Sequence, residues 1–302
     1  MSTGSDLAET AKALATPANT LIEKISNAIG AVFEPHQIVR LAKAESKAAI
    51  IKANTQIELT DIQRRAMHRM LEEETRKQIN IENVTKNALP YVQENAEPDK
   101  ISNDWVINFF EKSQNTTDEE MQNLWSKLLA GEANTPGKFS KRTVNLLADL
   151  DKKDAELFTS LCSFTWNLGG ISAPMIFYPE IENIMYKEKG LNFSNLTHLE
   201  TLGLVSFNNL AEFQFNNIGK ILNPVYFGVG LLLSFPNLNG NTLSFGHVML
   251  TQAGQELLSV CTPQKVEGFF EYMQSKWDVA SLLLKPTIQN SESTDTSSAQ
   301  QS

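Results

Sequence analysis

The amino-acid sequence predicts a mainly α protein with three parts: an extended N-terminal helical arm, a helical middle unit and a C-terminal winged-helix-like α+β module. Three observations predict it. Residues 36–89 contain neither glycine nor proline, helix-capping signals recur after residue 101, and β-favouring runs appear only after residue 210. We place the parts at residues 1–90, 91–162 and 163–285, followed by a disordered tail at 286–302.

Length and composition restrict the class of protein. The chain has 302 residues, a net charge of −9 and 41% hydrophobic residues, enough for a buried core. The acidic balance argues against a protein whose main task is to bind nucleic acid through its phosphates. Cys162 and Cys261 are too few for a disulfide scaffold. Without a secretory signal or an apolar run of ~20 residues, the sequence predicts a soluble, cytoplasmic protein.

The arm begins with an amphipathic segment at residues 14–33. Apolar side chains recur there at the spacing of one helix face, at Leu21, Ile25, Ile29 and Phe33. This face fits a helix packed on its own core, a helix that binds a partner, or a helix on a membrane surface. Few basic residues flank it, which favours its own core. Pro35 is expected to end or kink the helix.

The stretch at residues 36–89 is rich in strong helix formers. A continuous helix of this length would extend ~75 Å, too far to be covered by a small domain. It therefore packs on a second helix or on another subunit, or it breaks near Asn54 or Asn80. Its apolar positions do not keep a clean heptad, so a coiled coil is only one of these options.

A small basic cluster lies on this stretch and is followed by Glu72, Glu73 and Glu74. It fits either a solvated helix face or a partner-binding site. Our candidate partner-binding residues in the arm are Ile25, Ile29, Phe33, Arg64, Arg65 and Arg69.

The middle unit carries strong capping signals. Pro90 and the acidic stretch 93–100 predict a linker before it. Thr117 with Glu120 forms a predicted capping box, and Gly131 is expected to end the helix that follows. Ser140 and Asp151 are predicted to cap the next two helices.

The C-terminal part has the element order of a winged helix. A short helix at residues 195–201 exits through Leu-Gly-Leu-Val, strands are predicted at 211–215, 225–235 and 242–250, and Thr251 caps a further helix. Between residues 191 and 262 the only basic residue is Lys220, against three glutamates. DNA binding is therefore a minor alternative for this module, and packing or protein docking is favoured.

No active site is predicted. The four histidines lie in different elements without a second ligand at metal-binding spacing, and no phosphate loop or nucleophile elbow occurs. Helix capping explains the dense carboxylates at residues 149–156. We therefore predict no catalytic, cofactor-binding or metal-binding residues, and a protein that is not an enzyme.

The runs DEEMQNLWSKLLAGE, PGKFSKRT and LxxLDxxDAxLF, between residues 118 and 158, resemble a bacterial family known as domain-of-unknown-function family 2806. The segment GAVFEPHQIVRLAKAESKA is similar to that family's N-terminal region. LWSKLLA and LTxxGxELL also resemble, more weakly, the abortive-infection-alpha proteins. These resemblances imply a bacterial cytoplasm and an association with phage defence, and they supply no catalytic residues.

The sequence thus predicts a protein-interaction or assembly component whose arm binds a protein partner or forms a homo-oligomer. The alternatives are a winged-helix DNA-binding regulator and a membrane-acting effector that uses segment 14–33. If the arm is separate, deletion of residues 1–90 leaves a folded body with a changed assembly state.

Overall fold

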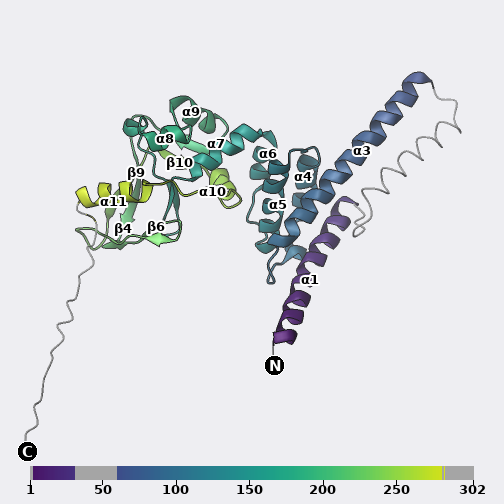
Figure 1. Cartoon of the computed structure of the whole chain (residues 1–302), viewed down its shortest axis with the longest axis horizontal. Coiled ribbons are helices and arrows are strands. Elements are labelled where there is room, and N and C mark those ends of the chain that lie inside the picture. Colours follow the sequence, from purple (N-terminus) through teal and green to yellow (C-terminus); the bar gives the residue numbers. More distant parts are fainter. Residues whose placement is uncertain (1–2, 31–59, 281, 283–302) are drawn as a thin grey trace, which may run out of the picture.

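The computed structural model describes residues 3–30, 60–280 and 282, with side chains from residue 16 onward. Phe33, Pro35, residues 36–59 of the predicted long helix and the predicted tail lie outside the described residues. Figure 1 shows a helical region around α3 to α6, a second region that holds the strands, and α3 reaching away from α4 and α5. The chain is mainly helical, with small antiparallel sheets in its C-terminal half.

The first helix, α1 (Thr3–Ile29), ends at a glycine. Gly30 adopts φ +69° and donates its backbone N–H to the carbonyl of Ser26 at 2.9 Å. Glycine reaches this left-handed conformation without strain. The helix therefore ends before Pro35, and the predicted stop at that proline is wrong.

The apolar face of α1 is covered by the chain itself. Leu21 and Ile25 are fully buried, and the helix packs on α4 (Asn103–Ser113) and on the short helix η2 (Pro98–Lys100). Lys24 Nζ also donates to the backbone carbonyl of Asp99 at 3.2 Å. Of the three alternatives for this segment, the structure has the helix packed on its own core.

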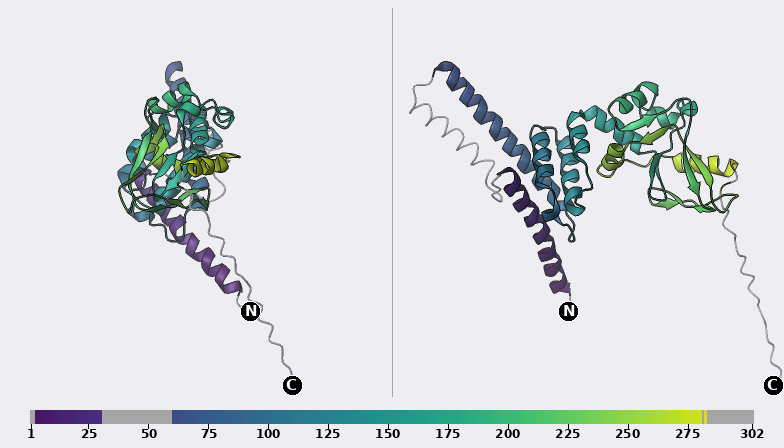
Figure 2. Two further views of the ribbon diagram at one scale, coloured as in Figure 1. Left: turned by 90° about the vertical axis from the view of Figure 1, so that its left-hand side faces the viewer. Right: turned by 180° about the vertical axis from the view of Figure 1, so that it is seen from behind.

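The next helix, α3 (Asp61–Ala88), runs unbroken through Asn80, one of the two predicted break points. The other, Asn54, lies outside the described residues. All buried residues of α3 fall in its last three turns, at Asn80, Ile81, Val84, Thr85 and Ala88. This C-terminal part packs on α5 (Glu119–Asn134) and α4, whereas none of residues 61–79 is buried. Both views in Figure 2 show the N-terminal end of α3 projecting from the helical region.

The stretch 93–100, predicted to be a linker, is packed on the helical region. After η1 (Leu89–Tyr91), the N–H of Gln93 donates to Asn134 Oδ1 at 2.8 Å, and the N–H of Glu97 donates to the Ala133 carbonyl at 3.0 Å. Pro98 is buried. These contacts tie the segment to the end of α5; the division of the chain into three parts stays a prediction.

Helix caps follow the sequence with two corrections. Ser140 caps α6 (Lys141–Asp149) and Asp151 caps α7 (Lys152–Cys162), as predicted. The N-cap of α5 is Asp118 rather than Thr117, because its carboxylate accepts two backbone N–H groups of the first turn at 3.0 Å.

The second correction concerns Gly131, which lies inside α5 and does not end it. A Cβ atom there would lie 2.7 Å from the ring of Phe139. The glycine thus allows that buried ring to pack directly on the helix.

Small sheets dominate the C-terminal region. One has the order β2-β1-β6-β7, from Ser172–Pro174, Thr165–Leu168, Pro224–Tyr226 and Val229–Gly230. Three further pairs are β3 with β10 (Val205–Phe207, Val248–Leu250), β4 with β9 (Phe213–Ile218, Asn241–Gly246) and β5 with β8 (Ile221–Leu222, Leu233–Ser234). The helical elements are η3 (Tyr178–Glu180), α8 (Ile184–Glu188), α9 (Phe193–Thr201), α10 (Gln252–Leu258) and α11 (Phe269–Val279).

The predicted single strand at 225–235 is wrong. Phe227 and Gly228 have φ values of 46° and 82°, so the chain turns back between β6 and β7. Consecutive positive φ values are typical of a tight hairpin turn. The apolar run therefore forms the two strands of a hairpin, β6 and β7, and then strand β8.

The start of α10 is fixed by a close approach of two backbones. Thr251 Oγ1 accepts the N–H of Gly254 at 3.1 Å and donates to the Gly203 carbonyl at 2.7 Å, so the predicted cap is confirmed. A Cβ atom at Gly254 would overlap the carbonyl oxygen of Leu204. The Thr and Gly of the LTxxGxELL motif thus have a structural role here.

Candidate functional site

The part of α3 that precedes Asn80 has no buried residue and begins at a defined cap. Thr60 and Gln63 form a capping box, in which the N–H of Thr60 donates to Gln63 Oε1 at 3.0 Å and the N–H of Gln63 donates to Thr60 Oγ1 at 3.4 Å. This reciprocal pair satisfies two orphan donors of the helix end. We call residues 61–79 the α3 arm; at 1.5 Å per residue it is ~28 Å long.

The α3 arm presents apolar and basic side chains to solvent. Ile62 is 72% exposed and Met70 is 63% exposed. They lie eight residues apart with Ala66 midway, so all three share one helix face. Arg65 and Arg69 are exposed beside them. This face of the α3 arm is therefore open to solvent.

Charge along the α3 arm changes sign. Arg64 pairs with Asp61 at 3.1 Å near the start, and Lys77 Nζ lies 3.3 Å from Glu73 and 2.7 Å from Glu74 further on. Water screens exposed pairs of this kind, so each contributes little to the stability of the helix. The α3 arm carries Arg64, Arg65 and Arg69 before Met70 and a run of three glutamates, residues 72–74, after it, followed by Arg76 and Lys77.

A polar seam holds the base of the α3 arm. Asn80 Nδ2 donates to the Gln114 carbonyl at 2.8 Å, and Gln122 Nε2 donates to Asn80 Oδ1 at 3.2 Å. Ser126 Oγ donates to the Val84 carbonyl at 2.9 Å. These groups are buried, so the hydrogen bonds also specify how α3 lies on α5.

The predicted partner-binding residues do not form one surface. Arg64, Arg65 and Arg69 lie together on the α3 arm. Ile25 is fully buried under α4 and η2, so its prediction as a contact residue is corrected: the chain itself covers it. Ile29 is partly buried against the same core, and Phe33 lies outside the described residues.

Sequence reasoning missed Ile62 and Met70. Their spacing with Ala66 is visible in the sequence, but the same spacing is also typical of a buried face. Which part of α3 is exposed depends on where α4 and α5 pack along the helix, and that is visible only in the structure.

Two histidines contact acidic or backbone groups far away in the sequence. His198 Nε2 lies 2.6 Å from Asp154 Oδ1, which connects α9 to α7. His247 Nδ1 accepts the N–H of Tyr178 at 3.2 Å, and burial lowers the pKa of this imidazole. His36 lies outside the described residues. Within the part of the chain that the structure describes, no three His, Cys, Asp or Glu side chains gather as a metal site.

Two glutamates organise the loop between α5 and α6. Glu132 is 2% exposed, and its carboxylate accepts the N–H groups of Gly137 at 2.6 Å and Phe139 at 2.9 Å. Burial raises the pKa of Glu132. Glu256 Oε2 accepts the N–H of Ser140 at 2.8 Å and the hydroxyl of Thr143 at 2.6 Å. Both carboxylates therefore serve packing, and Glu256 joins α10 to α6.

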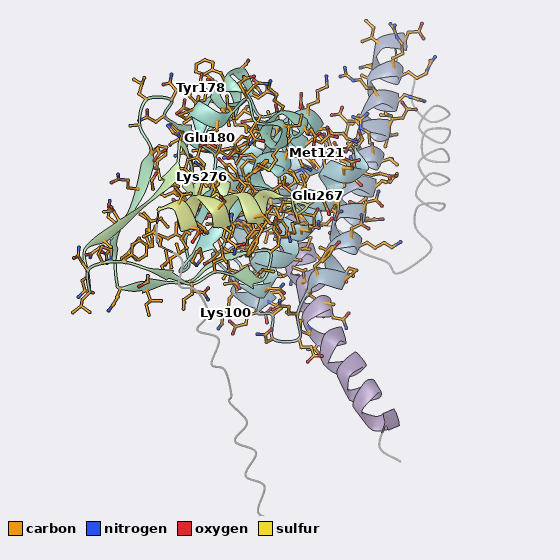
Figure 3. All side chains as sticks on the ribbon, turned by 60° about the vertical axis from the view of Figure 1, so that its left-hand side comes forward. Lys100, Met121, Tyr178, Glu180, Glu267 and Lys276 are labelled. Carbon is orange, nitrogen blue, oxygen red and sulfur yellow. The ribbon has the colours of Figure 1, made fainter. Side chains whose placement is uncertain are left out.

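A third polar cluster joins η3 to α11 (Figure 3). Lys276 Nζ donates to Glu180 Oε1 at 2.5 Å and lies 4.1 Å from the centre of the Phe177 ring. The hydroxyl of Tyr272 donates to the other oxygen of Glu180. Burial raises the pKa of Glu180, but the hydrogen bonds from Lys276 and Tyr272 outweigh it and lower the pKa overall. This saturated ion pair is a structural connection.

Fold and site together define a mainly helical protein with an exposed helical arm. No helix in residues 3–30 or 60–280 is long and apolar enough to cross a membrane. The chain belongs to the family described as "Protein of unknown function (DUF2806)", whose model matches residues 64–274. The match starts in the α3 arm and ends in α11, so α1 and the segment at 30–48 lie outside it. No curated protein and no solved structure matches the chain.

Proposed function

We propose that this protein is a non-enzymatic assembly component that associates with a second copy of itself through the α3 arm. The observation that carries the proposal is the exposure of Ile62 and Met70 on a capped helix that projects from the body. Covering them would remove apolar surface from water at ~25 cal/mol per Å².

Charge along the α3 arm supports a second copy as the partner. Two α3 arms side by side in opposite directions, in a register centred near Met70, would bring Arg64 and Arg65 of one arm toward Glu73 and Glu74 of the other. The same apolar face then lies between them. Complementary charges of this kind fix the register and orientation of paired helices more than they add affinity.

The test is a pair of substitutions in the full chain. Ile62→Lys with Met70→Lys places two charges on the proposed interface, and Leu210→Lys with Leu238→Lys is the matched control. Those two leucines are 90% and 74% exposed in the strand region. By light scattering, wild type and control should exceed the mass of one chain, 33.6 kDa, and the arm variant should return to it. A wild type with the mass of one chain at every concentration contradicts the proposal.

Deletion of residues 1–90 is not a suitable test. It would remove Val84 and Ala88, which are fully buried against the helical region. The change in mass would then follow from unfolding as well as from loss of the arm, which is why the surface substitutions are preferred.

We further propose that the elements α8 to α10 form a winged-helix-like module that packs or docks on protein. Its support is the order of α8, α9 and β3, then β10 antiparallel to β3, then α10. On α9, His198 pairs with Asp154, and Glu200 accepts the N–H of Phe207 at 2.9 Å. Side chains so engaged, in an acidic region, disfavour the DNA-binding alternative. Salt-sensitive retardation of a DNA fragment would favour it.

A cellular setting in phage defence is also a proposal. Its only support is the resemblance of LWSKLLA and LTxxGxELL to the abortive-infection-alpha proteins. The measurement is phage plating efficiency on cells that carry wild type, the arm variant or no copy. Equal plating on all three contradicts this setting without affecting the proposed assembly.

A further inference from the structure

Three aromatic rings meet at the surface around α9. Tyr178 comes from η3, Phe193 from the start of α9 and Phe207 from β3. Their ring centres lie 5.4 Å, 5.8 Å and 6.0 Å apart, with tilted or edge-to-face planes. We call these three residues the aromatic triad. Rings this close leave no space between them, so a ligand contacts their outer faces, and Phe193 is 50% exposed.

Backbone hydrogen bonds hold the aromatic triad in place. The N–H of Tyr178 donates to His247 Nδ1 at 3.2 Å, and the N–H of Phe207 donates to Glu200 Oε1 at 2.9 Å. His247 is 4% exposed, and burial lowers the pKa of its imidazole. A ring nitrogen that accepts a hydrogen bond carries no proton, so His247 is neutral and adds no positive charge here. The surface is therefore fixed before any partner arrives.

Two carboxylates flank the aromatic triad without a cation beside them. Glu200 lies seven residues after Phe193, so the two share one face of α9 at ~10 Å along its axis. Glu212 lies beside His247, because the residue after it pairs with the residue before His247 in β4 and β9. Residues 190–219 contain no lysine or arginine. In the part of the chain that the structure describes, neither carboxylate forms an ion pair with a basic side chain.

We propose that the aromatic triad is a docking surface for an arginine-bearing segment of another protein. The proposal rests on the protein-docking role proposed for α8 to α10, and it names the partner. One guanidinium stacks on the exposed face of Phe193, and the carboxylate of Glu200 accepts from the same or a neighbouring arginine. Arginine suits this surface better than lysine, because its planar group is more weakly hydrated and stacks on aromatic rings.

Charge decides between the classes of partner. A purely apolar segment would cover Glu200 and Glu212 without pairing them, which costs free energy. An anionic membrane surface or a nucleic acid would be repelled by the same carboxylates. A cationic segment gains from both the aromatic rings and the carboxylates.

The experiment measures binding of two peptides to the full chain by fluorescence anisotropy. One is a fluorescein-labelled Arg-Gly-Arg-Gly-Arg peptide, and the other carries citrulline in place of each arginine. Citrulline keeps the planar shape and loses the charge. At ~150 mM salt, where attraction beyond ~8 Å is largely screened, the arginine peptide should bind roughly tenfold more tightly.

Four variants locate the binding. Phe193→Ala and Glu200→Gln should each weaken binding of the arginine peptide by roughly threefold to tenfold. The glutamine can still accept the N–H of the β3 strand, so only the charge is lost. The matched controls are Phe227→Ala, at a ring that is 44% exposed, and Glu267→Gln, at an exposed carboxylate that lies apart from the labelled Tyr178 in Figure 3. Neither control should change the affinity.

Three results would overturn the proposal: equal binding of the two peptides, no binding of the arginine peptide, or an equal loss of affinity in the control variants. The first two need only wild-type protein, so they decide the matter even if a variant fails to fold. The docking role of the module fails by a different result, retardation of a DNA fragment by wild type. Assembly through the α3 arm is read separately, because Phe193→Ala should keep the wild-type mass by light scattering.

Discussion

The same substitution at two positions of α3 should have very different effects. Ile81 is 8% exposed and packs in the core, whereas Ile62 is 72% exposed on the α3 arm. Ile→Ala removes three carbon groups, each with ~0.8 kcal/mol of transfer free energy when buried. With the cavity left behind, Ile81→Ala should lower the free energy of unfolding by about 2–4 kcal/mol. Ile62→Ala should change it by no more than ~0.5 kcal/mol, since alanine is also the better helix former.

Urea unfolding followed by circular dichroism measures both variants under conditions in which the chain has the mass of one copy. The slope with urea should stay as in wild type, and only the midpoint of Ile81→Ala should fall. An equal loss of unfolding free energy at the two positions would refute the division of α3 into an exposed N-terminal part and an anchored C-terminal part.

Two further predictions concern residues that shape the body. Gly254→Ala should shift the urea midpoint strongly downward because its Cβ overlaps the Leu204 carbonyl, while Gly240→Ala, with φ +76° and open space around it, should cost only ~1 kcal/mol. Burial raises the pKa of Glu132 in the folded protein, so the folded state binds a proton more tightly than the unfolded state. This proton binding adds to the free energy of unfolding below the ordinary pKa of 4.5, and the added stability is lost as the pH rises through the raised pKa. Glu132→Gln should therefore remove that part of the pH dependence of the urea midpoint; an unchanged slope with pH would contradict it.

Local chemistry could be predicted from the sequence. Ser140, Asp151 and Thr251 each cap the helix expected of them, because a capping side chain bonds to backbone only three residues away. The predicted cap at Thr117 was wrong by one residue, since Asp118 caps α5. Both residues suit an N-cap, and only the backbone conformation selects one of them.

Long-range packing could not be predicted in this way. The apolar faces of α1 and α3 have similar periodicity, yet Ile25 is covered by α4 and Ile62 is not. The pairing of Asp154 with His198 joins residues that no local pattern connects. The position of these residues depends on how helices distant in sequence pack together.

Hydrogen–deuterium exchange of the full chain at low and high protein concentration tests the central claim most directly. If the α3 arm pairs with a second copy, amides in residues 62–72 should exchange more slowly as the concentration rises. Amides in residues 80–88, already anchored on α5, should not change. Unchanged exchange in the arm, under conditions where light scattering detects assembly, would show that another surface forms the contact.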